Sequence, residues 1–370
     1  MVKFLIVTKN SIKKIGICFS SLLILVGCGT MEKNKFDWLA SESGPQNYPM
    51  EVIDGEFYYY NDERGTSVPA GKVIADGWGT SVSTHVVGPD LKPLPNKLVI
   101  TFFSYTEDKF YHGEFNLPYD QILALFQEGF YAVSGQENRT YDKIVAGVSP
   151  GGGVAVWLRG RNYNTQVFYG KAKEAVIPWE RVLDAPEFSR EEVIKDTLEE
   201  EVDSQVLKEI IKNGPPLDRW DTYQKRYHWL FNFKTENRAP KIIRSVKYIN
   251  GERGYHFFPI NEKEATKNYA IPYEFNYYWE SPDGLFLTLK FTLNIEEVTA
   301  AFELLEQKYN VTAEEPILLT VYIFENKGKR KFGIAAQHGN KENTEIVLHK
   351  VKLKQHHAVD PKNPDAFYQD

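Results

Sequence analysis

The chain has 370 residues and a net charge of −6, from 44 Lys and Arg against 50 Asp and Glu. This acidic balance argues against nucleic acid as a partner, because binding to phosphates requires a basic surface. Both cysteines, Cys18 and Cys28, lie close to the N-terminus. Disulfides, thiolate zinc sites and a cysteine nucleophile are therefore excluded from the rest of the chain.

Residues 1–27 have the layout of a bacterial secretory signal peptide. Four lysines and no acid accompany an apolar run, Ile15–Val26, which is shorter than the about 20 residues that span a bilayer. The run ends in Leu25-Val26-Gly27-Cys28, which matches the lipobox at which a peptidase cuts and the thiol accepts lipid. We predict cleavage between Gly27 and Cys28 and lipidation of Cys28. An ordinary signal peptide or a buried apolar segment is the alternative.

Cleavage leaves 343 residues and removes four lysines, which changes the net charge from −6 to −10. Gly29 stands where an Asp usually retains enterobacterial lipoproteins in the inner membrane, so it favours the outer membrane, facing the periplasm. Residues 28–35 form the expected tether. Attachment through two or more acyl chains, palmitate among them, gives stable anchoring.

A first module is predicted over residues 36–180. Val and Tyr alternate with polar residues in its strands. A helix follows with Pro118 in its first turn and ends at Gly129. The expected strands are Met50–Tyr60, Val73–Val87, Lys97–Ser104 and Phe110–Asn116 before the helix, and 141–148, 153–160 and 164–174 after it.

A linker over residues 181–216 is predicted as one acidic helix, Arg190–Asn213. Ser189 and Glu192 form its capping box, and Gly214 with two prolines stops it. The helix is either a connector packed across both modules or a helix offered to a partner protein. Its apolar stripe comprises Val193, Ile194, Leu198, Val202, Leu207, Ile210 and Ile211.

Residues 217–354 repeat the pattern of the first module. Phe36-Asp-Trp38 matches Tyr227-His-Trp229 at an offset of 191, and Phe126 matches Phe302 at 176. Strands are expected at Lys241–Ile249, Glu274–Trp279 and Leu285–Thr292. A helix follows, capped by Asn294 with Glu297 completing a capping box. Residues 355–370 show no apolar period and are predicted to form a loose tail.

Strands outnumber helices, and the order is not an alternation of strand and helix. The sequence therefore predicts an α+β fold. It comprises two similar modules, each a mostly antiparallel sheet with one helix, joined by the acidic helical linker.

Two glycine patterns suggest chemistry, but their surroundings favour a turn. Gly147-Val-Ser149-Pro-Gly151 fits a nucleophile elbow, which requires a helix after the serine. Gly151-Gly152-Gly153 suggests a phosphate loop, which also requires a following helix. An apolar strand follows instead, so a hairpin turn is predicted.

Acids and histidines give weaker signals. Glu107, Asp108 and Glu114 flank a hairpin turn, and Glu280 and Asp283 flank the matching turn of the second module. Carboxylates at such turns are more often solvated than catalytic. The eight histidines lack metal-ligand spacing, and the adjacent pair lies in the tail, so no metal and no cofactor are predicted.

Over about residues 36–180 the chain resembles bacterial lipoproteins catalogued as domain of unknown function 2931. The second module lacks the glycine motifs and would be a diverged copy. The resemblance supplies no catalytic residues. The likeness is carried by Tyr48-Pro49, Gly77-Trp78-Gly79, the stretch Ser104–Tyr119 with Glu107 and Asp108, Pro150-Gly151-Gly152, and Trp157 with Arg159.

Some members of that family resemble immunity lipoproteins found beside secreted antibacterial effectors, particularly lipases of the type VI secretion system. The resemblance therefore implies a lipid-anchored, non-enzymatic binding protein of the envelope that blocks such an effector. An accessory or structural envelope lipoprotein and a hydrolase of envelope lipid or glycan are the alternatives. The hydrolase requires Ser149 or an acidic pair in a concave pocket.

Overall fold

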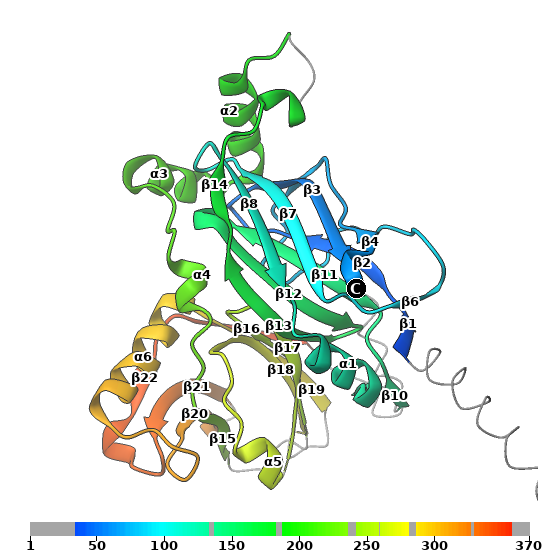
Figure 1. Ribbon diagram of the computed structural model, residues 1–370. Helices are drawn as coiled ribbons and strands as arrows, with labels where there is room; N and C mark the ends of the chain where they lie inside the picture. The colour runs from blue at the N-terminus through cyan, green and yellow to red at the C-terminus, as the bar shows by residue number, and fades with distance from the viewer. Residues whose placement is uncertain are drawn as a thin grey trace, which may run out of the picture.

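The computed structural model describes residues 34–132, 137–182, 187–235, 242–258, 260–280, 286–326 and 329–356. The predicted signal peptide, Cys28 and most of the tether lie outside these residues. The fold is α+β with far more strand than helix, and its sheets are mostly antiparallel, as predicted. Residues of the first half lie above those of the second in Figure 1. No helix within the described ranges is long and apolar enough to cross a membrane.

One sheet of the first half is antiparallel, with its strands in the order β14-β8-β7-β3-β4 and β5 also paired to β3. Its strands are β3 (Met50–Tyr58), β4 (Arg64–Ser67), β5 (Val73–Ile74), β7 (Lys97–Ser104), β8 (Lys109–Asn116) and β14 (Lys173–Ala175). Strand β7 alternates partly and fully buried residues along most of its length, which is why its bounds could be predicted. The predicted strand Val73–Val87 is wrong. Only its first two residues pair as a strand, and most of the remainder is a loop.

The first half also contains helix α1 (Tyr119–Glu128) and further strands before and after it in the sequence. Pro118 is the residue before the helix, and Gly129 ends it with a φ of 65°. Ile122 and Phe126 are the buried residues of its predicted apolar face. These further strands are β1 (Lys35–Asp37), β2 (Leu39–Ser43), β6 (Leu91–Pro93), β9 (Phe130–Ala132), β10 (Glu137–Arg139), β11 (Lys143–Ser149), β12 (Gly153–Gly160) and β13 (Tyr163–Lys171).

A nine-stranded sheet runs through both halves in the order β2-β11-β12-β13-β17-β16-β18-β19-β23. The halves join where β13 meets β17 at a single pair, Asn164 and Arg253. Strand β23 extends to His356, so the predicted tail from residue 355 begins inside a strand. The second-half strands are β16 (Ile242–Tyr248), β17 (Arg253–Phe257), β18 (Pro272–Glu280), β19 (Phe286–Leu293) and β23 (Val351–His356).

The second half also contains a four-stranded sheet, β15-β20-β21-β22, and helices α5 (Glu262–Ala265) and α6 (Ile295–Lys308). The Asn294 side chain caps α6 by accepting from the Glu297 backbone N–H at 2.9 Å. The other half of the predicted capping box is wrong. The Glu297 carboxylate accepts instead from the backbone N–H groups of His349 and Lys350, both at 2.8 Å. The strands are β15 (Trp229–Thr235), β20 (Ile317–Asn326), β21 (Lys329–His338) and β22 (Ile346–Leu348).

The predicted linker helix is two helices, α2 (Arg190–Glu201) and α3 (Ser204–Asn213), with a short α4 (Arg219–Thr222) after them. Ser189 and Glu192 form the predicted capping box. The two helices are separated at Val202, after which the Asp203 N–H donates to Asn47 Oδ1 at 2.8 Å and the Asp203 carboxylate caps α3. In Figure 1 α2 and α3 lie at the end of the first half that faces away from the second.

Each half encloses its own apolar core, and a fully buried tryptophan lies near the start of each. Trp38 Nε1 donates to the Pro93 carbonyl at 3.0 Å, and Trp229 Nε1 donates to the Ala270 carbonyl at 2.9 Å. Each tryptophan is followed by a strand that pairs in parallel with the first strand of a hairpin. These parallel pairs are β2 with β11 and β15 with β20.

Candidate functional site

The residues singled out in the sequence divide into two groups in space. One group, Gly77, Trp78, Gly79 and Arg159, lines a cavity of about 560 Å³ between the two halves, which we call the cleft. Its walls are the loop around Trp78, strands β12 and β13, and strands β16, β17, β18 and β19 of the second half. The lining residues with charged side chains are Asp76, Arg159, Arg161, Lys247, Glu252, Arg253 and Glu274.

Glycine at position 79 permits the close approach of the two halves at the cleft. Gly79 has a φ of 78°, and a Cβ there would lie 2.4 Å from the Gly251 carbonyl oxygen. The Asn164 amide joins the two turns, since its Nδ2 donates to the Gly79 carbonyl at 2.9 Å and to the Gly251 carbonyl at 2.6 Å. The Asn164 side chain therefore ties the motif loop, 85 residues before it in the sequence, to a turn 87 residues after it.

The Trp157 side chain of the first half contacts the second half at the cleft. Its ring is fully buried and meets Trp78 edge-on, with 4.8 Å between ring centroids. Its Nε1 donates to the Asn250 carbonyl at 3.2 Å. Gly147 provides the space, because a Cβ there would lie 2.3 Å from the Trp157 ring. These contacts make the base of the cleft a packed aromatic layer.

The cleft carries a surplus of positive charge in an acidic protein. Glu274 pairs with Lys247 at 2.9 Å and Lys290 at 2.8 Å, and Glu252 pairs with Arg226 at 2.9 Å. Among the lining residues themselves, four bases stand against three acids.

Arg159 lies within this positive group. Its Nη1 donates to the Gly79 carbonyl at 3.4 Å, which is a long hydrogen bond. Burial and then the charge of Arg253 lower the pKa of Arg159, while Asp142 opposes them. A half-buried guanidinium beside a second guanidinium favours an anionic group in the same space.

The second group gathers at the turn between β11 and β12. The Glu107 carboxylate accepts from the Gly151 N–H at 3.0 Å and from the Tyr111 hydroxyl at 2.7 Å. Glycine is required at 152, because φ is 77° and a Cβ would lie 2.5 Å from the Ala172 carbonyl oxygen. A one-turn 3₁₀ helix, Pro150–Gly152, completes the predicted hairpin.

This geometry does not fit the nucleophile elbow. Ser149 is fully buried, its hydroxyl lies 3.5 Å from the Pro150 carbonyl, and strand β12 follows the turn. The turn is therefore a brace between the two sheets of the first half.

Asp108 and Glu114 both form ion pairs but remain exposed to solvent, as expected for turn acids; the Asp108 side chain is 54% exposed. Arg190 Nε donates to Asp108 Oδ1 at 2.7 Å, and its Nη2 donates to the Asp108 carbonyl at 3.0 Å. The same guanidinium lies over the Trp179 ring, 5.2 Å from its centroid. Glu114 pairs with Lys97 at 3.1 Å and is 58% exposed. Of the matching acids in the second half, Asp283 lies outside the described residues.

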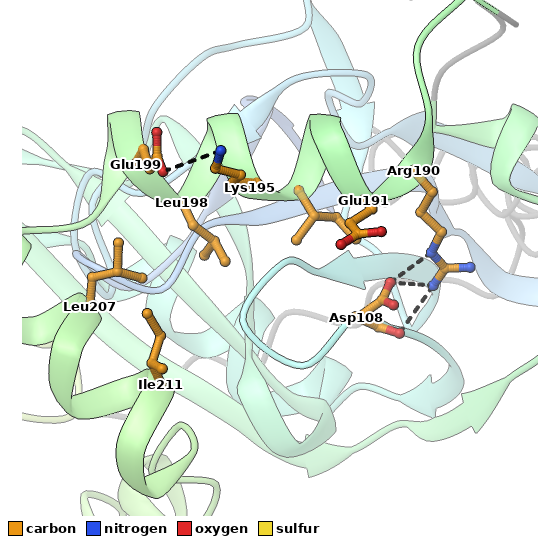
Figure 2. A pocket seen from close by; sticks show the side chains of 9 residues that line it. Asp108, Arg190, Glu191, Lys195, Leu198, Glu199, Leu207 and Ile211 are labelled. Atoms are coloured by element: carbon orange, nitrogen blue, oxygen red, sulfur yellow. Dashed lines mark hydrogen bonds and ion pairs between the residues drawn. The ribbon is translucent and has the colours of Figure 1, made fainter.

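A second cavity, which the sequence reasoning missed, lies between α2 and α3. It measures about 640 Å³, and Figure 2 shows Leu198, Leu207 and Ile211 pointing into it. We call it the groove. It exists because the linker forms two helices and not one, and the signal was the sequence Asp203-Ser204, typical of a helix start.

Metal ligands do not assemble in the part of the chain described above. No group of three or more His, Cys, Asp or Glu residues is placed to hold an ion there. Of the predicted tail histidines, His357 lies outside the described residues.

Comparison with known proteins yields a family match. No curated protein and no solved structure matches the chain. The model of the family described as "Protein of unknown function (DUF2931)" matches residues 28–218, just over half of the chain. The match extends past the predicted limit at 180 and includes α2 and α3, but not the second half. The chain therefore belongs to the DUF2931 family.

Proposed function

We propose, first, that the two halves are similar modules that arose by duplication. Three contacts recur at matching positions. Phe36 pairs with Lys92 as Tyr227 pairs with Tyr269. The Phe36 and Phe126 rings lie 5.0 Å apart, as those of Tyr227 and Phe302 lie 5.5 Å apart.

The third contact is the indole hydrogen bond of Trp38 and of Trp229 described above. The partners in all three contacts are displaced by 191 residues on one side and 176 or 177 on the other. These are the offsets found in the sequence, and their agreement with contacts supports the proposal.

We propose, second, that the protein is a lipid-anchored binding protein of the bacterial envelope, which acts by contact. The observation that carries this is the convergence of the family motif on the cleft. Trp78 and Gly79 come from one loop and Arg159 from strand β12, and each makes a close contact at the cleft walls. A rigid, positively charged recess suits an acidic loop of a protein partner.

Lipidation at Cys28 would keep this cleft close to the membrane. Seven residues, 28–34, precede β1. Fully extended, they would span at most about 25 Å. The body would thus remain within about one domain diameter of the bilayer, facing the periplasm if the outer membrane is its location.

The proposed partner is a secreted antibacterial effector such as a type VI lipase, which would make the protein an immunity protein. This rests on the family resemblance alone. An accessory envelope lipoprotein is the alternative, and it predicts co-purification with a resident envelope complex. The buried Ser149 gives no support to a hydrolase that uses this residue as nucleophile.

The test is co-expression of the effector encoded beside this protein, with survival as the readout. The wild type is expected to protect, and Arg161→Glu, at the exposed edge of the cleft, is expected to weaken protection at least tenfold. Arg181→Glu, an equal change of charge at an exposed position outside the cleft, serves as the matched control.

Cys28→Ser completes the set by separating anchoring from binding. It is expected to leave the membrane fraction and to lose protection in the periplasm, while binding to the purified effector is retained. Equal death with and without the wild-type protein would refute the immunity function. Equal protection by wild type and Arg161→Glu would remove the cleft from it.

A further inference from the structure

The groove between α2 and α3 is an apolar surface that the rest of the chain leaves open. Leu198 of α2 faces Leu207 and Ile211 of α3 across it (Figure 2), and Ile194 of α2 also lines it. Ile211 is 78% exposed, so a large β-branched side chain stands almost wholly in water. An exposed apolar patch rimmed by charge is typical of an interaction site.

Of the two groove residues of α3, Leu207 also packs against the cluster that holds the helix in place, whereas Ile211 does not. Ile210 on α3 and Val202 just before it are buried, in one cluster with Tyr48 and Trp220. That cluster accounts for the attachment of α3 to the body. Ile211 has no part in it and is therefore available to another molecule.

Charge specifies what kind of molecule fits. Residues 190–213 hold eight acids against four bases. Glu191 and Glu199 lie on the rim, where Lys195 approaches the Glu199 carboxylate at 4.0 Å. At the far end Arg190 is held by Asp108. The rim is thus acidic, and the base nearest its centre is already shared with a carboxylate.

We propose that the groove binds a basic amphipathic helix of a partner protein. The apolar face of that helix would lie on Leu198, Leu207 and Ile211, and its Lys or Arg residues would meet the acidic rim. Helices α2 and α3 have 12 and 10 residues. At 1.5 Å per residue they form walls about 15–18 Å long, which match about three turns of bound helix.

This surface is separate from the cleft, and the two differ in charge. The cleft is positive and polar, and the groove is negative and apolar. Binding at the groove therefore does not depend on the proposed use of the cleft. A negative result for the groove would leave the proposed function of the cleft untouched, and the reverse also holds.

The test uses the full chain carrying Cys28→Ser, so that neither lipid nor detergent competes for the probe. The probe is a synthetic helical peptide of 18 residues with Leu on one face and Lys on the other, and binding is followed by fluorescence anisotropy. Ile211→Lys should weaken binding at least tenfold, through repulsion and loss of apolar contact.

Val86→Lys is the matched control, because Val86 is 79% exposed and lies outside the groove. It should leave the affinity within twofold of the parent. Both positions are exposed, so both variants are expected to fold, and thermal melting checks this. Glu191→Lys should weaken binding, and 0.5 M salt should weaken it further.

Three results would overturn the proposal. An equal loss of affinity in Ile211→Lys and Val86→Lys would show binding to general negative charge. Equal binding of a Leu/Glu peptide would show that the sign of charge plays no part. Sedimentation of the parent as a dimer, with Ile211→Lys monomeric, would assign the groove to a second copy of this chain.

Discussion

The two halves share a framework, but they differ at the turn that joins the hairpin strands next to the parallel pair. In the first half β11 and β12 are joined by three residues, since Ser149 pairs with Gly153. In the second half β20 and β21 are joined by two, since Asn326 pairs with Lys329. Only the longer turn presents an N–H group that the Glu107 carboxylate binds.

The halves also differ in what they contribute to the cleft. The first half provides the glycine loop and the tryptophans, and the second provides a turn at Gly251 with the ionised residues behind it. Matching core contacts occur in both halves, whereas the glycine loop and the turn bound by Glu107 lie in the first half. This difference teaches that a shared scaffold constrains buried residues far more than turns.

The largest expected effect tests the equivalence of the two cores. Trp38→Ala and Trp229→Ala each remove a fully buried indole, and each should lower the free energy of unfolding by about 3–5 kcal/mol. Urea unfolding followed by circular dichroism measures this. Val347→Ala, at a 48% exposed position, should change it by less than about 0.5 kcal/mol. A large loss in only one tryptophan variant would contradict the duplication.

The contact between the halves can be tested with two glycines of matched backbone. Gly79 and Gly71 have φ of 78° and 77°, but nothing lies within 4 Å of a Cβ at 71. Gly71→Ala should cost about 1–2 kcal/mol from the left-handed backbone alone. Gly79→Ala should cost about 1–3 kcal/mol more, because its Cβ meets the Gly251 carbonyl. Calorimetry compares them, and equal costs would show that the halves do not press together there.

Acid sensitivity should distinguish the second half through its buried imidazole. Burial lowers the pKa of His256 from its usual 6.5 to about 4, so the fold requires the neutral ring. Its contribution is present above pH 6.5 and is lost as pH falls from 6.5 towards 4, by about 1.4 kcal/mol per pH unit. Between pH 7.5 and 5.0 the wild type should lose about 2 kcal/mol more than His256→Gln.

Urea midpoints at the two pH values measure this difference. His85→Gln serves as a control, since His85 is exposed and its ring is hydrogen-bonded to the Ser67 hydroxyl through Nδ1. It should retain the wild-type pH dependence. If His256→Gln also retains it, the buried imidazole does not account for the acid sensitivity.

The smallest expected effect concerns the three-residue turn between β11 and β12 in the first half. Glu107→Gln removes the charge from two hydrogen bonds, to Gly151 and Tyr111, and should cost about 1–2 kcal/mol. Glu114→Gln breaks an exposed ion pair with Lys97 and should cost less than about 1 kcal/mol. Thermal melting compares the two, and equal shifts would mean that the longer turn is not braced by Glu107.

Much of the strand arrangement was predictable, because alternation of apolar residues is a local signal. The bounds of β7 agree with the prediction to the residue, and those of β8 to one. The loop after Ile74 has a similar alternation of Val with polar residues, yet lacks a neighbouring strand along most of its length. Whether a segment forms a strand depends on the strand that lies beside it in the fold, and the sequence of the segment alone does not encode that neighbour.

The prediction of a single helix for the linker was wrong for a related reason. An apolar stripe runs through residues 193–211 without interruption, so one helix was the simpler prediction. At the break Asp203 caps α3 locally, and its N–H donates to Asn47, 156 residues away. The local cap was a signal in the sequence, whereas the contact with Asn47 was not.

The sequence by itself determined the α+β class, the family, the hairpin in place of a nucleophile elbow, and the offsets at which buried rings recur. These follow from local periodicity, turn chemistry and motif spacing. Only the tertiary structure decided that the motif residues divide between a positive cleft and a braced turn, and that an open groove separates α2 from α3. Those outcomes depend on contacts between residues far apart in the chain, and such contacts leave no pattern within a single segment.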